Sequence, residues 1–321
     1  MSRRPRQRGA ALLTAMIIVT LVASLAAAMV WRQYRAVQVE AAERARAQGA
    51  WILEGALDYA RLFLREDARE NQKTPVDHLN EVWAVPLAEA RLSTFLAMDK
   101  SNADEGPEAF LSGTIADAQA QYNLRQLVAA TDAAKLAPEL RVLQRLCESA
   151  GAPPNTADLI ATRLRAAYAI SGSEGRDRTD VALQPQTLDQ LGWFGLSTDT
   201  IERLRPLVTL LPTVTPVNLN TAPREVIAAL FDGMDLATAQ RIVQIRQSSP
   251  FNNVQDIKTY VPTGVEISSE RASVMSSYFV VTGRLRLEER LLEERSLVRR
   301  VGLDMVVMSR QRISQVLENR R

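Results

Sequence analysis

Hydrophobic and polar positions predict a long N-terminal helix, a helical middle and a stranded C-terminal part. Residues 10–31 carry no charge, and this stretch of about 22 residues is long enough to cross a bilayer as one helix. Further on, small or apolar residues recur at steps of three and four, which keeps them on one face of a helix. This stripe, in which Gln48 is the only polar member, consists of Tyr34, Val37, Ala41, Ala45, Gln48, Ile52, Ala56, Tyr59 and Phe63. We therefore predict one continuous helix over residues 10–64, about 80 Å long.

The segment after this helix changes to mixed structure. The run Asn71–Pro75 breaks the helix, and the following stretch Asp77–Leu96 predicts a short helix that packs back on the first one. Residues Asp99–Pro107 form an acidic loop, for which solvation is the simpler interpretation because the spacing of a calcium loop is missing. Residues Ala109–Ala116 have the pattern of a strand.

From about Asn123 to Ser273 the pattern is almost entirely helical. Asn220 or Thr221 is expected to cap a helix that tolerates Pro223 in its first turn. A turn at Asp232–Asp235 and a second helix follow, and then comes a Pro-Phe segment, so the stretch resembles a helix-hairpin-helix unit. Asn123 with the next Leu repeats the later Asn-Leu pair at position 218, which indicates a weak internal duplication.

The pattern of the C-terminal part predicts strands. Tyr278–Leu287 alternates apolar and charged positions, as a half-buried strand does. Leu291–Arg300 and Leu303–Met308 are plausible partner strands, although the acidic and basic residues around Glu294 would equally favour a helix. The predicted fold class is α+β, in which the helical middle interrupts a sheet that begins near Phe110 and resumes near Tyr278.

Composition excludes several classes of function. The net charge of the 321 residues is +2, and four arginines precede the apolar run, so the remainder is nearly neutral and lacks a general footprint for nucleic acid. The chain has one cysteine, Cys147, and one histidine, His78, which excludes an intramolecular disulfide and most histidine-based chemistry. We expect Cys147 in the core and His78 at a boundary. Because the sequence also contains no nucleophile elbow, phosphate loop or zinc motif, we expect no catalytic residue, no metal site and no enzyme.

Three interpretations fit the basic, then apolar, N-terminus. It could be a cleaved secretory signal ending near Ala26–Ala28, or an uncleaved anchor, and in both cases the arginines keep the N-terminus in the cytoplasm. The third is a leader that ends at Gly9, directly before the apolar run. A cleaved signal has no reason to continue in phase into a longer helix, so the continuation favours a retained helix.

The pair Arg8-Gly9 followed by an apolar helix resembles the leader of type IV prepilins and pseudopilins. The resemblance implies that prepilin peptidase removes residues 1–9 and that the mature chain begins at Ala10. Most members carry Glu five residues after the cut, where it pairs with the terminal amine of the subunit ahead; this chain has Thr14 there. The resemblance therefore implies that no subunit lies ahead of this one.

The lack of that Glu, together with motifs along nearly the whole chain, is similar to the K-type minor pseudopilins of type II secretion systems. The matching features are Trp83–Leu87, Asp117 with Asn123-Leu124, Val217–Ala222, Pro250-Phe251 and Ser277–Phe279. The implied architecture is a transmembrane and stalk helix with a pilin-like antiparallel sheet, interrupted by a large all-α insertion of helix-hairpin-helix (SAM-like) units. The expected divisions are leader 1–9, stalk 10–64, pseudopilin-like domain 65–117 and 274–321, and insertion 118–273.

The same resemblance implies a function and partners. It places the chain at the tip of a periplasmic pseudopilus, where it supports pseudopilus initiation and protein export. The implied partners are the I-type and J-type minor pseudopilins, other inner-membrane components of the secretion system and prepilin peptidase. The chain would be a single-pass protein of the inner membrane, with its N-terminus in the cytoplasm and its bulk in the periplasm.

Calcium is the one cofactor that the resemblance raises, since relatives can bind it in the helical domain. The corresponding stretch here is Ala169–Asp180, which offers Glu174 and Asp177 but has no Asp-X-Asp run before the Gly. We therefore expect no cofactor.

A membrane-anchored helix-hairpin-helix DNA-binding protein is the alternative from another class. Such hairpins present backbone amides to phosphates, whereas the turn Asp232–Asp235 would place two acids there. We accordingly expect no nucleic acid partner.

Overall fold

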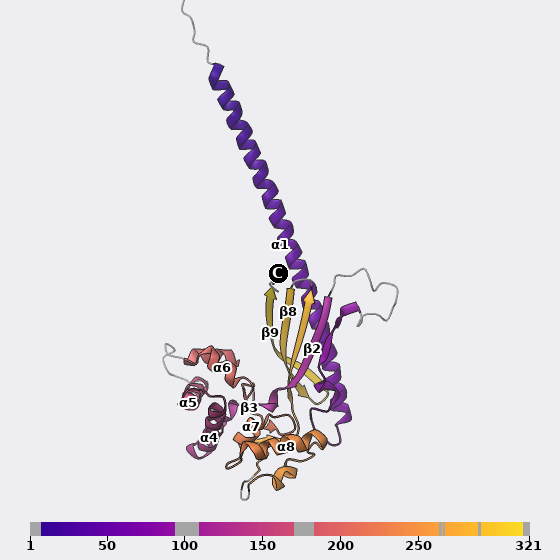
Figure 1. The fold of residues 1–321 in the computed structure, drawn as a ribbon, viewed down its shortest axis with the longest axis vertical. Coiled ribbons are helices and arrows are strands. Elements are labelled where there is room, and N and C mark those ends of the chain that lie inside the picture. Colours follow the sequence, from indigo (N-terminus) through magenta and orange to yellow (C-terminus); the bar gives the residue numbers. More distant parts are fainter. Residues whose placement is uncertain are drawn as a thin grey trace, which may run out of the picture. The chain divides into compact units, whose positions relative to one another are not determined.

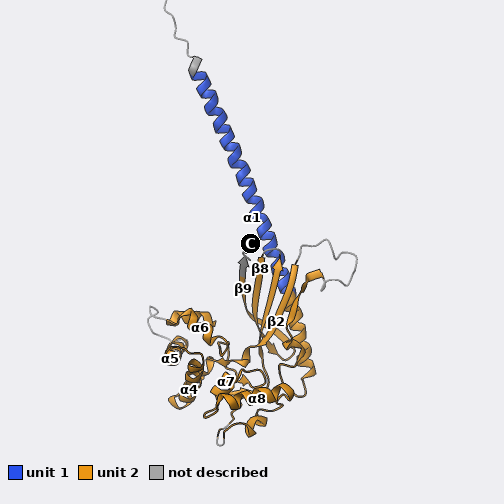
Figure 2. Cartoon of the chain, in the orientation of Figure 1, with its two compact units in different colours: residues 1–55 blue, residues 56–321 orange. Residues whose placement is uncertain are grey.

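The computed structural model describes residues 8–93, 109–169, 183–262, 265, 267–287 and 290–316, and the chain forms two compact units, residues 1–55 and 56–321 (Figure 2). The first unit contains most of helix α1 (Arg8–Glu70), and the second contains its last turns, a sheet and a helical region (Figure 1). Helix α1 confirms the predicted continuous helix and ends at Glu70, directly before the breaking run that starts at Asn71. The predicted acidic loop at Asp99–Pro107 lies outside the described residues.

The second unit contains one antiparallel sheet of five strands. Its order is β1 (Leu87–Arg91), β2 (Ala109–Asp117), β7 (Tyr278–Leu287), β8 (Arg290–Val301) and β9 (Asp304–Val316). The strands predicted at Ala109 and Tyr278 are confirmed. The stretch around Glu294, where a helix remained possible, is a strand. A two-residue turn joins β8 to β9, and its Gly302 has φ +60°, a conformation that residues with a Cβ rarely adopt.

Within Asp77–Leu96, where the sequence predicts a short helix, the chain first forms a 3₁₀ turn, η1 (Val82–Ala84), and then strand β1, which pairs irregularly with β2. Helical residues follow at 92–93, and residues 94–96 lie outside the described part of the chain. Pro86 has no amide hydrogen and therefore stops a helix from continuing. Trp83 anchors η1, because its side chain is buried and its ring packs edge-on against Phe279 at 5.3 Å. The sheet therefore begins at Leu87, rather than near Phe110.

The last turns of α1 pack on one face of this sheet. Leu57, Ala60 and Leu64 are buried there against side chains of the sheet that include Phe279, Val281 and Val298. These helix positions do not belong to the stripe that the sequence pattern singled out. Of the stripe members in this part of the helix, Tyr59 remains 52% exposed, and Ala56 and Phe63 are half-buried.

Residues 118–277 form a helical region between two strands that are neighbours in the sheet, β2 and β7. Its helices surround one hydrophobic core and gather near the labels α4 to α8 in Figure 1. They are α3 (Arg125–Ala129), α4 (Ala133–Ser149), α5 (Thr156–Ala169), α6 (Thr198–Leu204), α7 (Arg224–Leu230) and α8 (Leu236–Ser248). The 3₁₀ turns are η2 (Ala118–Ala120), η5 (Leu188–Phe194) and η6 (Val254–Thr259).

Two small parallel ladders in the helical region repeat one pattern. β3 (Tyr122–Asn123) pairs with β4 (Val208–Thr209), and β5 (Val217–Asn218) pairs with β6 (Ala272–Ser273). In both ladders, the backbone nitrogen of the first residue of the leading strand donates to the backbone oxygen of the residue that precedes the partner strand. The backbone nitrogen of the residue that follows the leading strand donates to the backbone oxygen of the last residue of the partner strand. The donor–acceptor distances are 2.8–2.9 Å. Each ladder thus joins the start and the end of one helical unit, as the predicted duplication requires. The helix-hairpin-helix classification of these units stays a prediction.

The start of α7 differs from the prediction. Pro223 occupies the cap position, and neither Asn220 nor Thr221 caps the helix. The Asn220 side chain instead forms two hydrogen bonds with the backbone of Phe251, one to its oxygen and one from its nitrogen, both at 2.9 Å. The Asn220 side chain thus forms tertiary hydrogen bonds, although the local sequence pattern predicts that it caps the helix.

Leu64 tests which face of α1 carries the fold. Because its side chain is fully buried, Leu64→Ala should lower the free energy of unfolding by about 2–5 kcal/mol. The matched control is Leu62→Ala on the exposed face, which should change it by no more than about 0.5 kcal/mol. Urea unfolding of the full chain in detergent measures both, and equal losses would contradict this orientation of the helix.

Candidate functional site

The N-terminal part of α1 presents apolar side chains all round. Among the described residues, α1 is the one helix that is long and apolar enough to span a membrane, with a mean hydropathy of 2.4 over its best window. Leu12, Ile17 and Val22 are each more than half exposed in the isolated chain. Burying side chains of this kind requires lipid or another apolar helix, so this end of α1 is suited to be a single-pass membrane anchor.

The three residues predicted to matter for processing and assembly lie together in the first turns of α1. Gly9 and Ala10 are already helical, and Ala10 is exposed. The hydroxyl of Thr14 donates to the backbone oxygens of Ala10 and Ala11, at 3.0 Å each. Thr14 therefore satisfies its donor within its own helix and offers no carboxylate to a neighbouring chain.

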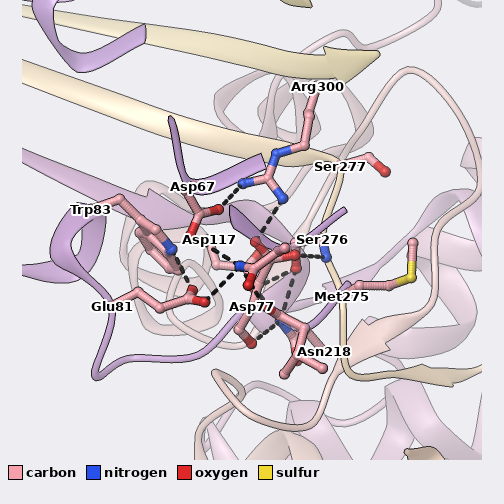
Figure 3. A network of polar contacts seen from close by, with 12 residues as sticks. Asp67, Asp77, Glu81, Trp83, Asp117, Asn218, Met275, Ser276, Ser277 and Arg300 are labelled. Atoms are coloured by element: carbon pink, nitrogen blue, oxygen red, sulfur yellow. Dashed lines mark hydrogen bonds and ion pairs between the residues drawn. The ribbon is translucent and has the colours of Figure 1, made fainter. Parts of the chain in front are cut away.

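A second group of polar residues is buried where α1, the sheet and the helical region meet (Figure 3). We call it the junction. Its members are Asp67 at the end of α1, Asp77 and Glu81 in the following loop, Asp117 at the end of β2, Asn218 in β5, Ser276 before β7 and Arg300 in β8. Segments far apart in the sequence thus supply one network of hydrogen bonds and ion pairs.

Arg300 is the cation of the junction. Its guanidinium donates from Nη1 to Asp77 Oδ1 at 2.7 Å and from Nη2 to Asp67 Oδ2 at 2.5 Å (Figure 3). The same group lies over the ring of Phe279, with Cζ 4.7 Å from the ring centre. One arginine of β8 therefore binds the end of α1 and the loop after it to the sheet.

Asp117 joins the sheet to the helical region. Its carboxylate accepts hydrogen bonds from Thr221 Oγ1 and Ser276 Oγ at 2.6 Å each. It also accepts from Asn218 Nδ2 at 3.0 Å and from the Gln119 backbone nitrogen at 2.7 Å. With four donors on one buried carboxylate, the connection depends on every one of these side chains lying in place.

Burial raises the pKa of the junction carboxyl groups. The pKa of Asp67 is raised to about 7, first by burial and then by the nearby charge of Glu81, although Arg300 acts in the opposite direction. Burial raises the pKa of Asp117 to about 6 against the effect of its hydrogen bonds, and it raises that of Asp77 as well. The junction therefore holds protons at a pH where carboxyl groups in water are fully ionised.

The junction carboxylates accept hydrogen bonds from groups of the protein itself. Asp67, Asp77 and Glu81 each have an oxygen within 4.8 Å of the others, a spacing that would also suit a metal ion. Arg300 bridges two of them, and Glu81 accepts hydrogen bonds from the Trp83 indole at 2.6 Å and from the His78 backbone nitrogen at 2.9 Å. In the stretch Ala169–Asp180, which the resemblance relates to calcium binding, Glu174 and Asp177 lie outside the described residues.

Cys147 and His78 lie where the sequence analysis expected them. Cys147 is buried in the core of the helical region, and burial raises the pKa of its thiol to about 12, so the unreactive thiol is the form present near neutral pH. His78 is half-buried, with Nε2 at 3.9 Å from Glu81 Oε1. Neither residue meets a partner that would activate a nucleophile.

Comparison with known proteins gives one consistent family. The sequence model of the family "Type II secretion system (T2SS), protein K" matches residues 217–282. A Type II secretion system protein K from Pseudomonas aeruginosa is 29% identical and covers 89% of this chain and 87% of its own length. Its counterpart from Klebsiella pneumoniae is 27% identical, over 95% of this chain and 96% of its own length.

The fold agrees with the sequence comparisons. A chain in the crystal structure of the GspK-GspI-GspJ complex from enterotoxigenic Escherichia coli superimposes with a TM-score of 0.64. The match covers 84% of this chain and 98% of that chain, at 21% identity. The chain is thus similar, over nearly its whole length, to proteins named type II secretion system protein K, and it shares the fold of a chain from the GspK-GspI-GspJ complex.

The part of the chain that matches the family model includes two members of the junction and one of its hydrogen-bond donors. Residues 217–282 run from β5 into β7 and contain Asn218, Thr221 and Ser276. In the sequence, Asp117 and Asn218 served only as marks of the resemblance, and Asn220 or Thr221 was expected to cap a helix. A signal was present, because two Asn side chains within an apolar run require buried hydrogen-bond partners. The sequence alone did not show that Asp117 and Asp77 are those partners.

Arg300 tests whether the junction depends on its cation. Arg300→Met leaves Asp67 and Asp77 buried without their guanidinium and should cost about 3–5 kcal/mol of unfolding free energy at pH 8. The loss should shrink at pH 5.5, because protonated carboxyl groups need no counter-charge.

The matched control is Arg284→Met in β7, whose ion pair with Glu293 is more than half exposed on the arginine side. Arg284→Met should change the free energy of unfolding by no more than about 1 kcal/mol. Urea unfolding of the full chain at the two pH values measures both variants. A loss for Arg300→Met that is the same at both pH values would contradict this account of the junction.

Proposed function

We propose that this chain is a protein K of a type II secretion system, a minor pseudopilin that occupies the tip of the periplasmic pseudopilus, supports pseudopilus initiation and thereby supports protein export. The observation that carries the proposal is Thr14, whose hydroxyl is bonded within its own helix. A chain with Thr14 in place of Glu offers no carboxylate for the terminal amine of a subunit ahead. The helical region of residues 118–277 adds bulk that would hinder further stacking, which supports the same position.

Processing by prepilin peptidase between Gly9 and Ala10 is part of this proposal. Four arginines within residues 1–9 precede the apolar run, and positive charge stays on the cytoplasmic side of a membrane. The chain would then be a single-pass protein of the inner membrane, with its N-terminus in the cytoplasm and its bulk in the periplasm. Residues 10–31 remain as the anchor after cleavage.

I-type and J-type minor pseudopilins are the proposed partners. The structural relative comes from a complex of GspK, GspI and GspJ, and it shares this fold. In the chain itself, the N-terminal end of the stripe is exposed, with Tyr34 at 60% and Val37 at 64%. Apolar positions of this kind along a stalk fit the stalk helices of the partners. The other inner-membrane components of the secretion system would contact the same anchored chain.

The proposed division of labour follows the expected domains. The stalk of residues 10–64 would assemble, the pseudopilin-like domain of residues 65–117 and 274–321 would give the subunit its pilin-like body, and the insertion of residues 118–273 would cover the tip. The pairing of β2 with β7 across the insertion supports this division.

The DNA-binding alternative is not favoured. The family match points to secretion, and the turn between α7 and α8 is engaged within the protein. Asp232 pairs with Arg145 at 2.7 Å, and Asp235 caps α8 by accepting from the Thr238 backbone nitrogen at 2.7 Å. Acids on both sides of this turn would repel phosphate.

The processing site can be tested by mass spectrometry of the chain extracted from membranes. The intact mass should correspond to a chain that starts at Ala10, because the peptidase cuts after Gly9. A Gly9→Val variant should keep its leader and retain the full mass. A start at Met29 or Trp31 would instead identify an ordinary secretory signal and contradict the proposal.

The stripe can be tested by co-purification. Ala41→Arg with Ala45→Arg places two charges on the stripe, and we expect at least a tenfold loss of I-type and J-type partners because each charge would have to be buried or displaced. Ala36→Arg with Ala47→Arg places the same charges on the opposite face and serves as the control. Equal recovery of the partners with both double variants would show that the globular part does the binding.

A further inference from the structure

We propose that the outer edge of β9 is a strand-addition site that binds an extended acidic segment of another protein. The segment would pair with β9 through backbone hydrogen bonds and place its carboxylates beside Arg310 and Arg312. The proposal is independent of the position of the subunit in the pseudopilus, because it concerns one edge of the sheet in the second unit.

The two edges of the sheet differ. β1 is five residues long, directly follows Pro86 and pairs irregularly with β2, and each of these features protects an edge from further pairing. β9 is thirteen residues long and pairs with β8 along its whole length, apart from one irregularity beside Val298. In the part of the chain that the structure describes, β9 has no second neighbour in the sheet. This edge is therefore long enough to take another strand.

Alternation in the ladder determines which backbone groups of β9 point outwards. The backbone nitrogen of Arg300 donates to the oxygen of Ser277, so the even-numbered residues of β8 bond to the side of β7 and the odd-numbered residues bond to β9. The β9 partners of the odd-numbered residues, such as Gln311, thus direct their backbone groups toward β8. Arg310 and Arg312 alternate with them, so their backbone N–H and C=O groups point away from the sheet.

The start of this edge, next to the hairpin, is already occupied. Met305 lies opposite Arg300, so its backbone also points outwards, and its oxygen accepts a hydrogen bond from Arg61 of α1 at 2.8 Å. The irregularity beside Val298 follows soon after it along β9. The part of the edge that is suited to strand addition therefore starts at Arg310.

The side chains along this part of the edge are basic. Arg310 and Arg312 lie two positions apart on the same face of the sheet, and both are exposed. Arg312 pairs with Glu294 of β8, which shows that a carboxylate on an adjacent strand fits against it. Opposite charges on neighbouring strands stabilise their pairing, whereas like charges weaken it. The edge therefore favours a segment that carries carboxylates at alternate positions.

A second copy of this chain is the less suitable occupant. Its own β9 carries the same two arginines, so the pairing of equivalent segments would bring arginine opposite arginine. An antiparallel copy would also direct the last turns of its α1 the opposite way, whereas two chains with the same anchor start from the same side of a membrane. These constraints favour a segment of a different protein.

Hydrogen exchange of the full chain in detergent, measured residue by residue, tests the site with synthetic peptides. The probe is a nine-residue peptide in which glutamate alternates with valine, and the control peptide carries lysine in place of glutamate. The glutamate peptide should slow the exchange of the Arg310 and Arg312 amides by at least about fivefold at saturation, because both amides gain a hydrogen-bond acceptor. The Gln311 amide, which already points toward β8, should change by less than about twofold. The lysine peptide should need at least about tenfold higher concentration for the same protection.

The same measurement can overturn the proposal in more than one way. If neither peptide protects the Arg310 and Arg312 amides, the edge is not a strand-addition site. Equal protection by both peptides would contradict an acidic partner. Protection that grows with the concentration of the chain alone, without peptide, would identify a second copy as the occupant and would also overturn the proposal.

Arg310→Ala tests the contribution of charge without removing a backbone group. With the Arg312 amide as the reporter, the preference for the glutamate peptide over the lysine peptide should fall at least about threefold. The control is Arg284→Ala in β7, which removes the same charge from the other face of the sheet, away from this edge, and should keep the full preference. An equal preference in both variants would contradict the role of Arg310 in selecting an acidic segment.

Discussion

The pairing of β2 with β7 is the constraint on which the rest of the second unit depends. Asp117 at the end of β2 lies opposite Phe279 at the start of β7, although the whole helical region separates them in the sequence. The chain must therefore leave the sheet and return to it at one end. Closing so long a segment costs little more than closing a shorter one, because the loop-closure entropy grows only slowly with length. Two strands, a linker and the end of α1 thus meet in one small volume, and their polar groups need partners there.

The junction meets this need with charged groups and thereby determines how the helical region is attached. Arg300 holds Asp67 and Asp77, and Asp117 collects donors from β5 and from the segment before β7. Apolar packing alone tolerates small shifts, whereas a carboxylate with four hydrogen bonds tolerates few. The consequence is a helical region held in a defined place on the sheet.

Helix α1 serves the membrane, the sheet and the exterior with different residues. Leu57, Ala60 and Leu64 face the sheet, while Tyr34, Val37 and Tyr59 of the stripe stay exposed. A helix has room for this because positions four apart return to one face while positions between them point elsewhere. The same stalk can therefore carry its own domain and still present an apolar stripe to neighbouring helices.

By itself, the sequence determined the features that depend on local pattern. The apolar run before Trp31 and the in-phase continuation predicted α1, the alternation from Tyr278 predicted β7, and the Gly9 and Thr14 positions indicated the family before any comparison. Periodicity is a property of neighbouring residues, so it can be read from the chain directly. The sequence pattern did not predict the strand at Leu87, because its side chains are mostly exposed and show no clear alternation of apolar and polar residues.

Only the tertiary structure decided which face of α1 packs on the sheet and which residues form the junction. The stripe ending at Phe63 and the buried face through Leu64 are both apolar, and contact with β7 and β8, rather than the pattern, selects between them. Asp67, Asp117, Asn218 and Arg300 are each unremarkable in the sequence, and they become one site because the strand order brings them together. Their raised pKa values follow from burial, which no local pattern encodes.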